Sequence, residues 1–122
     1  MKKILLYLNE AKEENIELAL SLAEKFSSRL YVLFCLNSEE IKNEELKDKK
    51  EDEGWQKLYD VEEKAFQKEV KVSLLFFEGI PEILISELMK SYEIEALILN
   101  PFANLNLSEV ISKNREKIII LK

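Results

Sequence analysis

The chain has 122 residues, and its 24 aspartates and glutamates outnumber its 18 lysines and arginines, which gives a formal net charge of −6 at neutral pH. This balance argues against a nucleic-acid partner, because phosphate backbones are bound through clustered lysine and arginine. A chain of this length typically forms one domain and buries about two thirds of its unfolded surface. We therefore expect a single domain over residues 1–122.

Histidine is absent, and cysteine occurs once, at Cys35. Without histidine the chain lacks the commonest acid–base residue and metal ligand, and no Ser-His or Cys-His nucleophile pair can form. We therefore expect no enzyme activity and no metal site. A lone cysteine forms no internal disulfide, which suits a reducing cytoplasm. No run approaches the roughly 20 apolar residues of a membrane span, so no membrane partner is expected.

The first third of the chain alternates between strand and helix patterns. Residues 4–8 form an apolar run that stops at Asn9, which predicts a central strand rather than a signal peptide. Apolar residues then recur at helical spacing over about 12–27. Residues 30–36 are typical of a second strand. Cys35 is interpreted as a small buried apolar residue, because nothing near it in the sequence would activate the thiol.

Residues 38–53 are dominated by glutamate, aspartate and lysine, with almost no apolar face. Such a segment predicts a solvated loop or a frayed helix, ended by Gly54; the alternative is a docking surface for a basic partner. A helical stripe resumes from Trp55 to Phe66, and Trp55 is expected to anchor this helix at the edge of the core. Residues 70–78 alternate in their first half, which indicates a strand at or near a sheet edge.

The clearest pattern lies in residues 78–100, EGIPEILISELMKSYEIEALILN. Gly79 is expected to form the turn that leaves the third strand, and Pro81 suits the first position of a helix. Apolar residues follow at three- and four-residue steps. Residues 96–99 form an apolar run without alternation, typical of a strand buried on both faces. A connector, a short helix and a last strand over residues 117–122 complete the chain.

Five strands thus alternate with about four helices. This pattern predicts an α/β protein with a doubly wound, mostly parallel sheet of flavodoxin-like topology and strand order 3-2-1-4-5. In such sheets ligands bind beyond the carboxyl ends of the strands, near the topological switch point. The turn 9–11 and the connector 100–108 would line that crevice.

Two stretches carry a resemblance to a known family. The first resembles the opening strand, turn, helix and second strand of universal stress proteins; it reads ILLYLNEAKEENIELALSLAEKFSSRLYVLFCL. The second resembles the Gly-x-Pro turn, third helix and fourth strand of the same family; it reads EGIPEILISELMKSYEIEALILN. In members that bind ATP, an Asp after the first strand holds the adenosine, and a G-x2-G-x9-G-S/T loop after the fourth strand wraps the phosphates. The resemblance places Asn9 at that Asp, and Asn100, Ala103 and Ser108 on the loop.

The matched loop departs from the family pattern, because it lacks glycines that let backbone amides approach a phosphate. Ala103 tolerates the left-handed conformation poorly, Pro101 has no amide to donate, and no lysine or arginine lies between positions 90 and 113. Glu10 and Ala11 stand on the Gly-Ser pair that follows the family's Asp, and the Glu10 carboxylate would repel a phosphate. The sequence therefore predicts a divergent member without the glycine-rich ATP loop and without a bound cofactor.

The connector is instead expected to consist of turns and caps. Three asparagines are predicted to act as turn and cap residues: Asn100, Asn104 and Asn106. The last of these resembles a capping box with Glu109. Phe102 and Leu105 are predicted to fill the mouth of the crevice.

The last strand is unusually apolar for a sheet edge, and exposed edges of that kind pair with other chains. In the resembling family this strand commonly pairs with its two-fold mate. We therefore expect a homodimer with an interface formed by Ile118, Ile119, Ile120 and Leu121.

Three hypotheses about function remain. The favoured one is a non-catalytic regulatory or stress-response module that acts through dimerisation and contacts with a protein partner, without ATP. The alternative is a regulatory domain that binds ATP or AMP through Asn9, Asn100, Ala103 and Ser108 in a rebuilt loop. A phosphoacceptor of the receiver type shares this sheet and length, but it needs an acidic cluster after the first strand and an Asp after the third, which this chain lacks.

Overall fold

The computed structural model describes every residue from Met1 to Lys122. Strands and helices alternate along the chain: β1 (Lys3–Tyr7), α1 (Glu13–Phe26), β2 (Arg29–Asn37), α2 (Glu44–Gln67), β3 (Val72–Gly79), α3 (Pro81–Ser91), β4 (Ala96–Leu99), α4 (Leu107–Lys113) and β5 (Ile118–Leu121). All strand pairs are parallel, in the order β3-β2-β1-β4-β5. The predicted fold class and strand order are confirmed.

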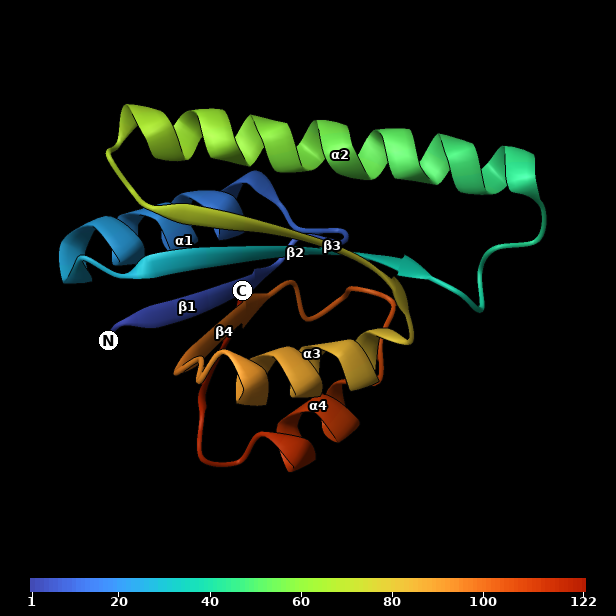
Figure 1. Cartoon of the computed structure of the whole chain (residues 1–122). Helices are drawn as coiled ribbons and strands as arrows, with labels where there is room; N and C mark the ends of the chain where they lie inside the picture. Colours follow the sequence, from blue (N-terminus) through green and yellow to red (C-terminus); the bar gives the residue numbers. More distant parts are fainter.

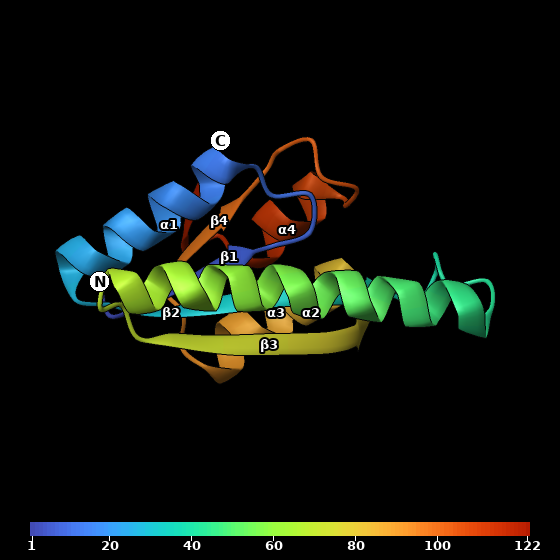
Figure 2. The same cartoon turned by 90° about the horizontal axis from the view of Figure 1, so that it is seen from above.

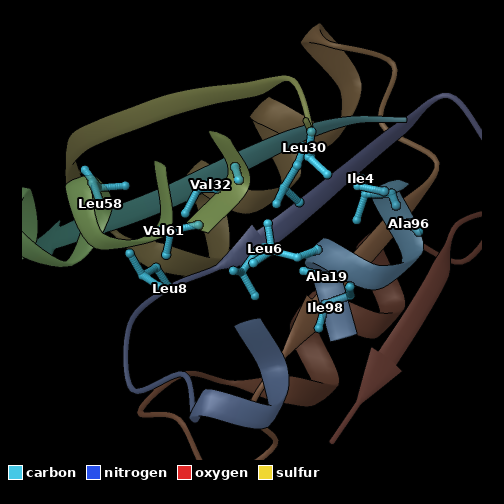
Figure 3. Packing of buried hydrophobic residues seen from close by; sticks show 14 of the residues in the cluster. Ile4, Leu6, Leu8, Ala19, Leu30, Val32, Leu58, Val61, Ala96 and Ile98 are labelled. Carbon is cyan, nitrogen blue, oxygen red and sulfur yellow. The ribbon is translucent and has the colours of Figure 1, made fainter. Parts of the chain in front are cut away.

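Two helical layers enclose the sheet. Helices α1 and α2 cover one face, and α3 and α4 cover the other (Figure 1). On the first face, Ile4 and Leu6 of β1 pack in one cluster with Ala19 of α1 and with Leu58 and Val61 of α2 (Figure 3). β1 carries an unbroken apolar run because both of its faces are buried in this way.

Helix α2 corrects the prediction for the charged segment. The loop or frayed helix expected over residues 38–53 is wrong from position 44 onward, since α2 runs unbroken from Glu44 to Gln67. Its amino-terminal turns extend beyond the end of β3 (Figure 2). The Asn43 side chain caps the helix by accepting from the Leu46 amide at 2.8 Å, and Lys47 Nζ lies 3.1 Å from the Glu78 carboxylate. Caps and ion pairs therefore replace the missing apolar face.

Gly54 lies inside α2 and does not end it. The residue is buried, and a Cβ at this position would lie 2.5 Å from Phe34 Cδ1 and 2.8 Å from Phe76 Cε2. Glycine costs a helix about 1 kcal/mol relative to alanine, but here it lets the helix backbone approach the two aromatic rings. The prediction failed because a glycine that breaks a helix and a glycine that permits close packing look the same in sequence.

Gly79 makes its turn without unusual backbone geometry. No glycine has a positive φ, whereas four other residues take the left-handed conformation: Glu10, Ser27, Glu69 and Glu93. The turn into α3 relies on Pro81, which occupies the first turn of that helix as predicted. Of the four left-handed residues, Glu10 lies in the turn after β1, at the expected crevice.

Candidate functional site

A small crevice opens at the carboxyl end of the sheet, between the turn after β1, the end of β2 and helix α2. Its volume is about 280 Å³, and ten residues line it: Tyr7, Asn9, Glu10, Phe34, Asn37, Glu40, Lys50, Glu53, Lys57 and Asn104. Small-molecule sites usually measure about 300–1,000 Å³, so this crevice lies just below that range. It sits beside the switch point between β1 and β4, where this fold is expected to bind ligands.

Asn9 extends the pairing of β1 with β2 beyond the end of the strand. Its side-chain Nδ2 donates to the Cys35 carbonyl at 2.8 Å, and its Oδ1 accepts from the Cys35 amide at 2.8 Å. Both polar groups of this side chain are thus engaged by one backbone unit. The residue that matches the family's Asp lies in the crevice, but its side chain ties the turn after β1 to strand β2.

Glu10 ties the turn after β1 to the connector after β4. The Asn100 side chain donates to the Glu10 carbonyl at 2.7 Å and accepts from the Phe102 amide at 3.0 Å. The Glu10 carboxylate accepts from the Asn104 amide at 2.5 Å. Glu10 adopts φ 57°, a conformation that suits glycine, the residue that the family resemblance puts there. The Glu10 side chain thus supplies a carboxylate to the connector from a backbone position that favours glycine.

A second carboxylate binds the other end of the connector. Glu82 in the first turn of α3 accepts from the Asn106 amide at 2.5 Å. The Asn106 side chain caps α4 by accepting from the Glu109 amide at 3.1 Å, as predicted. Only half of the predicted capping box forms, because the Glu109 carboxylate binds Lys113 at 2.7 Å instead.

The four residues proposed for nucleotide binding do not converge on one site. Asn9 lines the crevice and Asn100 lies beside it, whereas Ala103 is 7% exposed and belongs to the core under α3 and α4. Ser108 is exposed in the first turn of α4, where its hydroxyl donates to Asn106 Oδ1 at 2.9 Å. The structure therefore separates Ala103 and Ser108 from the crevice.

Phe102 does not fill the mouth of the crevice. Its side chain is 83% exposed, and Lys12 Nζ lies 5.7 Å from the centre of its ring, so this prediction is wrong. Leu105, the other residue expected there, packs against the core below α3 and α4. The tight Asn100–Phe102 turn explains the difference, because it directs the chain outward before Ala103 returns to the core.

Sequence reasoning missed two lysines of the crevice. Lys50 and Lys57 come from α2 and line it together with Glu10, Glu40 and Glu53. The Lys50 ammonium lies 3.5 Å from the Glu40 carboxylate, so its charge is already partly compensated. A helical reading of the 44–67 segment would have placed Lys50 and Lys57 on one side, seven residues apart.

No activated nucleophile occurs near the crevice. Burial, reinforced by the Glu82 and Glu40 carboxylates, raises the pKa of the Cys35 thiol to about 12. The expected buried role of Cys35 is confirmed, since it is 1% exposed. Burial also raises the pKa of Tyr7. No cluster of three or more metal-ligating side chains is present.

These observations describe a doubly wound α/β protein with a small polar crevice beside its switch point, next to a connector whose Asn104 and Asn106 amides are bound by internal carboxylates. No protein-family model and no curated protein sequence matches the chain. Its backbone is similar to solved structures of universal stress proteins, and the chain has the fold of that family. One from Burkholderia pseudomallei has a TM-score of 0.81 and 14% identity, covering 99% of this chain and 95% of that one.

Two other similar structures hold a nucleotide. The Archaeoglobus fulgidus universal stress protein in complex with dAMP has a TM-score of 0.70 and 17% identity, over 99% of this chain and 97% of that one. The Arabidopsis thaliana family protein with AMP bound has a TM-score of 0.70 and 14% identity, over 100% and 92%. None of the four helices in the present chain is long and apolar enough to span a membrane.

Proposed function

We propose that the chain is a non-catalytic, universal-stress-protein-like regulatory module that works without ATP, through homodimerisation and contacts with a protein partner. The observation that carries this proposal is the use of loop amides by internal carboxylates. Glu10 binds the Asn104 amide and Glu82 binds the Asn106 amide, each at 2.5 Å. These are the kind of backbone donors that a phosphate-binding loop presents to its ligand.

A polyphosphate at this loop would have to displace both carboxylates and then lie beside them. Each hydrogen bond to a charged group contributes about 1.5–3 kcal/mol when protected, and less at the surface, where these lie. The larger cost is the repulsion between a phosphate and two carboxylates that stay nearby. The Asn100–Ala103 turn adds no free donor, because the Phe102 and Ala103 amides are bound by Asn100.

A non-catalytic role is supported by the chemistry of the crevice. The Cys35 thiol is buried with a raised pKa, and histidine is absent from the sequence. The crevice therefore lacks histidine, the commonest acid–base residue near neutral pH, and the Cys35 thiol is not activated as a thiolate nucleophile. The unpaired cysteine suits the cytoplasm, where we place the protein.

The proposed dimer uses the outer side of β5. The Ile118 and Lys122 amides donate toward β4, to the carbonyls of Glu95 and Leu99. Because successive strand residues point their backbone groups to opposite sides, those of Ile119 and Leu121 point away from the sheet. The Ile118 and Leu121 side chains are 52% and 41% exposed. An apolar edge with unpaired donors and acceptors is a template for a second strand.

Native mass spectrometry with and without ATP and magnesium tests the proposal. We expect a ligand-free dimer in both conditions. The double variant Glu10→Gly with Glu82→Gln should gain weak nucleotide binding, because it frees the amides and removes two negative charges, and glycine suits the φ of 57° at position 10. A wild-type chain that retains an adenine nucleotide would contradict the proposal.

A regulatory domain that binds AMP or ATP is the second candidate. The crevice with Lys50 and Lys57 favours it, as do the similar structures that contain AMP and dAMP. This candidate predicts a rise in melting temperature with nucleotide, lost in the variant Lys50→Gln with Lys57→Gln. An unchanged melting temperature at millimolar AMP and ATP would exclude it.

A further inference from the structure

One side of α2 combines exposed aromatic rings with acidic side chains. We call this set the acidic-aromatic stripe; its members recur at three- and four-residue steps on neighbouring turns. They are Asp48, Asp52, Trp55, Tyr59, Glu62, Glu63 and Phe66. The exposed fractions of Trp55, Tyr59 and Phe66 are 38%, 54% and 83%, so the rings are open to a partner.

Three of the five lysines of α2 lie on the side of the helix away from the stripe. Lys50 and Lys57 line the crevice, and Lys64 Nζ lies 2.6 Å from Glu13 of α1. Lys47 is paired with Glu78 at the end of β3, and Lys49 lies one turn from Asp52. Most of the positive charge of α2 therefore faces the crevice and α1, whereas the acidic-aromatic stripe faces the β3 edge of the sheet.

The stripe lies alongside a free strand edge. Trp55 stacks on Phe76 of β3 with ring centres 5.1 Å apart and on Tyr59 with centres 5.6 Å apart. Below it, a groove of about 510 Å³ is lined by Tyr59, Glu62, Glu63, Phe66, Val70 and Val72. Figure 2 shows α2 running along β3. A strand added beside β3 would therefore meet the stripe with one of its faces.

The outer side of β3 offers backbone groups for such a strand. The carbonyls of Lys71 and Gly79 accept inward, from the amides of Leu30 and Ser38, and the register with β2 is unbroken. Because the backbone groups of successive strand residues point to opposite sides, the N–H and C=O groups of the four residues between these positions point away from the sheet. These are Val72, Leu74, Phe76 and Glu78. No proline or lysine interrupts β3, the devices that usually protect an edge.

We propose that the β3 edge and the acidic-aromatic stripe form a docking site for an extended, basic segment of another protein. The segment adds a strand to β3, and its lysine and arginine side chains on the face beside α2 lie against the stripe's carboxylates and over its rings. The inference rests on the proposed role as a protein-binding module and names the kind of partner.

A second copy of the chain fits this site less well. Two β3 edges paired about a two-fold axis would bring two α2 helices together, each with nine acidic and five basic residues, so like charges would meet. The β5 strand of another copy is flanked by Lys117 and Lys122 but has four residues against eight in β3. Its head-to-tail pairing would also build an open chain of molecules rather than a closed assembly.

The test uses the full chain and a synthetic peptide of alternating lysine and valine, matched in length to β3. Trp55 is the only tryptophan, so its fluorescence reports binding at the stripe directly. We expect a saturable change that weakens with added salt. A peptide with glutamate in place of lysine should not bind. Two further peptides carry N-methyl groups on the backbone nitrogens of either the odd or the even positions; only the one whose methyl groups lie on the edge facing β3 should lose binding.

Matched variants locate the site. Glu62→Lys with Glu63→Lys should weaken binding about tenfold, because two attractive charges become repulsive. Glu53→Lys with Asp60→Lys makes the same change in net charge at exposed positions of α2 outside the stripe and should change affinity by less than about twofold. Circular dichroism of both pairs checks that the fold is retained.

Four results would overturn the inference: equal losses in the two pairs of variants, equal affinity for the acidic peptide, no saturable signal up to about 1 mM peptide, or an assembly that grows with protein concentration. Failure here is distinct from failure of the proposed function. If the protein is a nucleotide-free dimer but does not bind the peptide, only the docking site is refuted. A monomer that binds the peptide refutes only the β5 dimer.

Discussion

The two edges of the sheet present the same kind of unpaired backbone in different surroundings. At one edge, β3 has eight residues and lies beside the acidic-aromatic stripe of α2. At the other, β5 has four residues between Lys117 and Lys122. Four residues of β3 turn their backbone groups outward, whereas Ile119 and Leu121 do so in β5.

Edge exposure alone therefore does not specify a partner. Both strands could template a further strand, and only the side chains beside them distinguish the occupants. The β5 edge offers a short apolar surface that suits a second copy of itself. The β3 edge adds aromatic rings and carboxylates, which favour a basic segment.

The largest expected effect comes from separating α2 from β3. Gly54→Val should reduce the free energy of unfolding by about 3 kcal/mol, because the new side chain overlaps the rings of Phe34 and Phe76. Denaturant unfolding measures it. The matched control is Gly79→Ala, whose Cβ would lie 3.3 Å from Leu84 Cδ1 and should cost less than about 1 kcal/mol. Equal losses at the two glycines would show that the close approach of α2 is unimportant.

The next effect concerns the β5 edge. Ile118→Lys should weaken the proposed dimer at least about tenfold, since a charge on an apolar edge opposes strand pairing. Ile111→Lys on α4 is the control, because Ile111 is similarly exposed, at 42% against 52%. Sedimentation equilibrium measures the dissociation constants. If both variants stay dimeric, the interface lies elsewhere, and peptide binding at β3 should be unaffected in either case.

A smaller, pH-dependent effect is expected beside β4 and β5. The Glu95 carboxylate accepts from the Lys2 amide at 2.8 Å, and this bond lowers the pKa of Glu95 below its ordinary value of 4.5. A lowered folded-state pKa contributes stability above the ordinary value, and that contribution is lost as the pH falls through the lowered one. The stability difference between wild type and Glu95→Gln should therefore shrink below pH 4.5, as measured by unfolding at several pH values. A difference that is constant with pH would contradict this assignment.

The smallest effect is expected at the exposed end of the acidic-aromatic stripe. Phe66→Ser should change the free energy of unfolding by less than about 0.5 kcal/mol, because the ring is 83% exposed. The same variant should weaken peptide binding at β3, since Phe66 lines the groove there. A large loss of stability would mean that the ring supports the fold rather than a partner.

Apolar periodicity predicted most of the fold because it is a local property. The unbroken runs of β1 and β4 and the apolar stripes of α1 and α3 are visible over a few residues, and parallel pairing with helical crossovers allows few topologies. Helix α2 was missed in part, since its amino-terminal half is stabilised by the Asn43 cap and by ion pairs to Glu78 and Glu40, which are distant or weakly signalled in sequence.

The candidate site was predicted less completely. The turn at Asn9 and Glu10 was placed correctly at the crevice, since parallel strands end at one edge of the sheet. Which groups bind one another there could not be predicted, because Glu10 and Asn104 are 94 residues apart. The same reason hid Lys50 and Lys57, whose position depends on how α2 lies across the sheet.

The alternation of strands and helices, the doubly wound sheet and the burial of Cys35 could be predicted from the sequence alone, because each follows from residue type or short-range spacing. Three features became visible only in the three-dimensional structure: Glu10 and Glu82 bind the amides of the connector, Gly54 lets α2 pack against Phe34 and Phe76, and the acidic-aromatic stripe borders β3. Those features depend on side chains brought together from distant segments, and the orientation of packed helices, rather than any local pattern, sets their contacts.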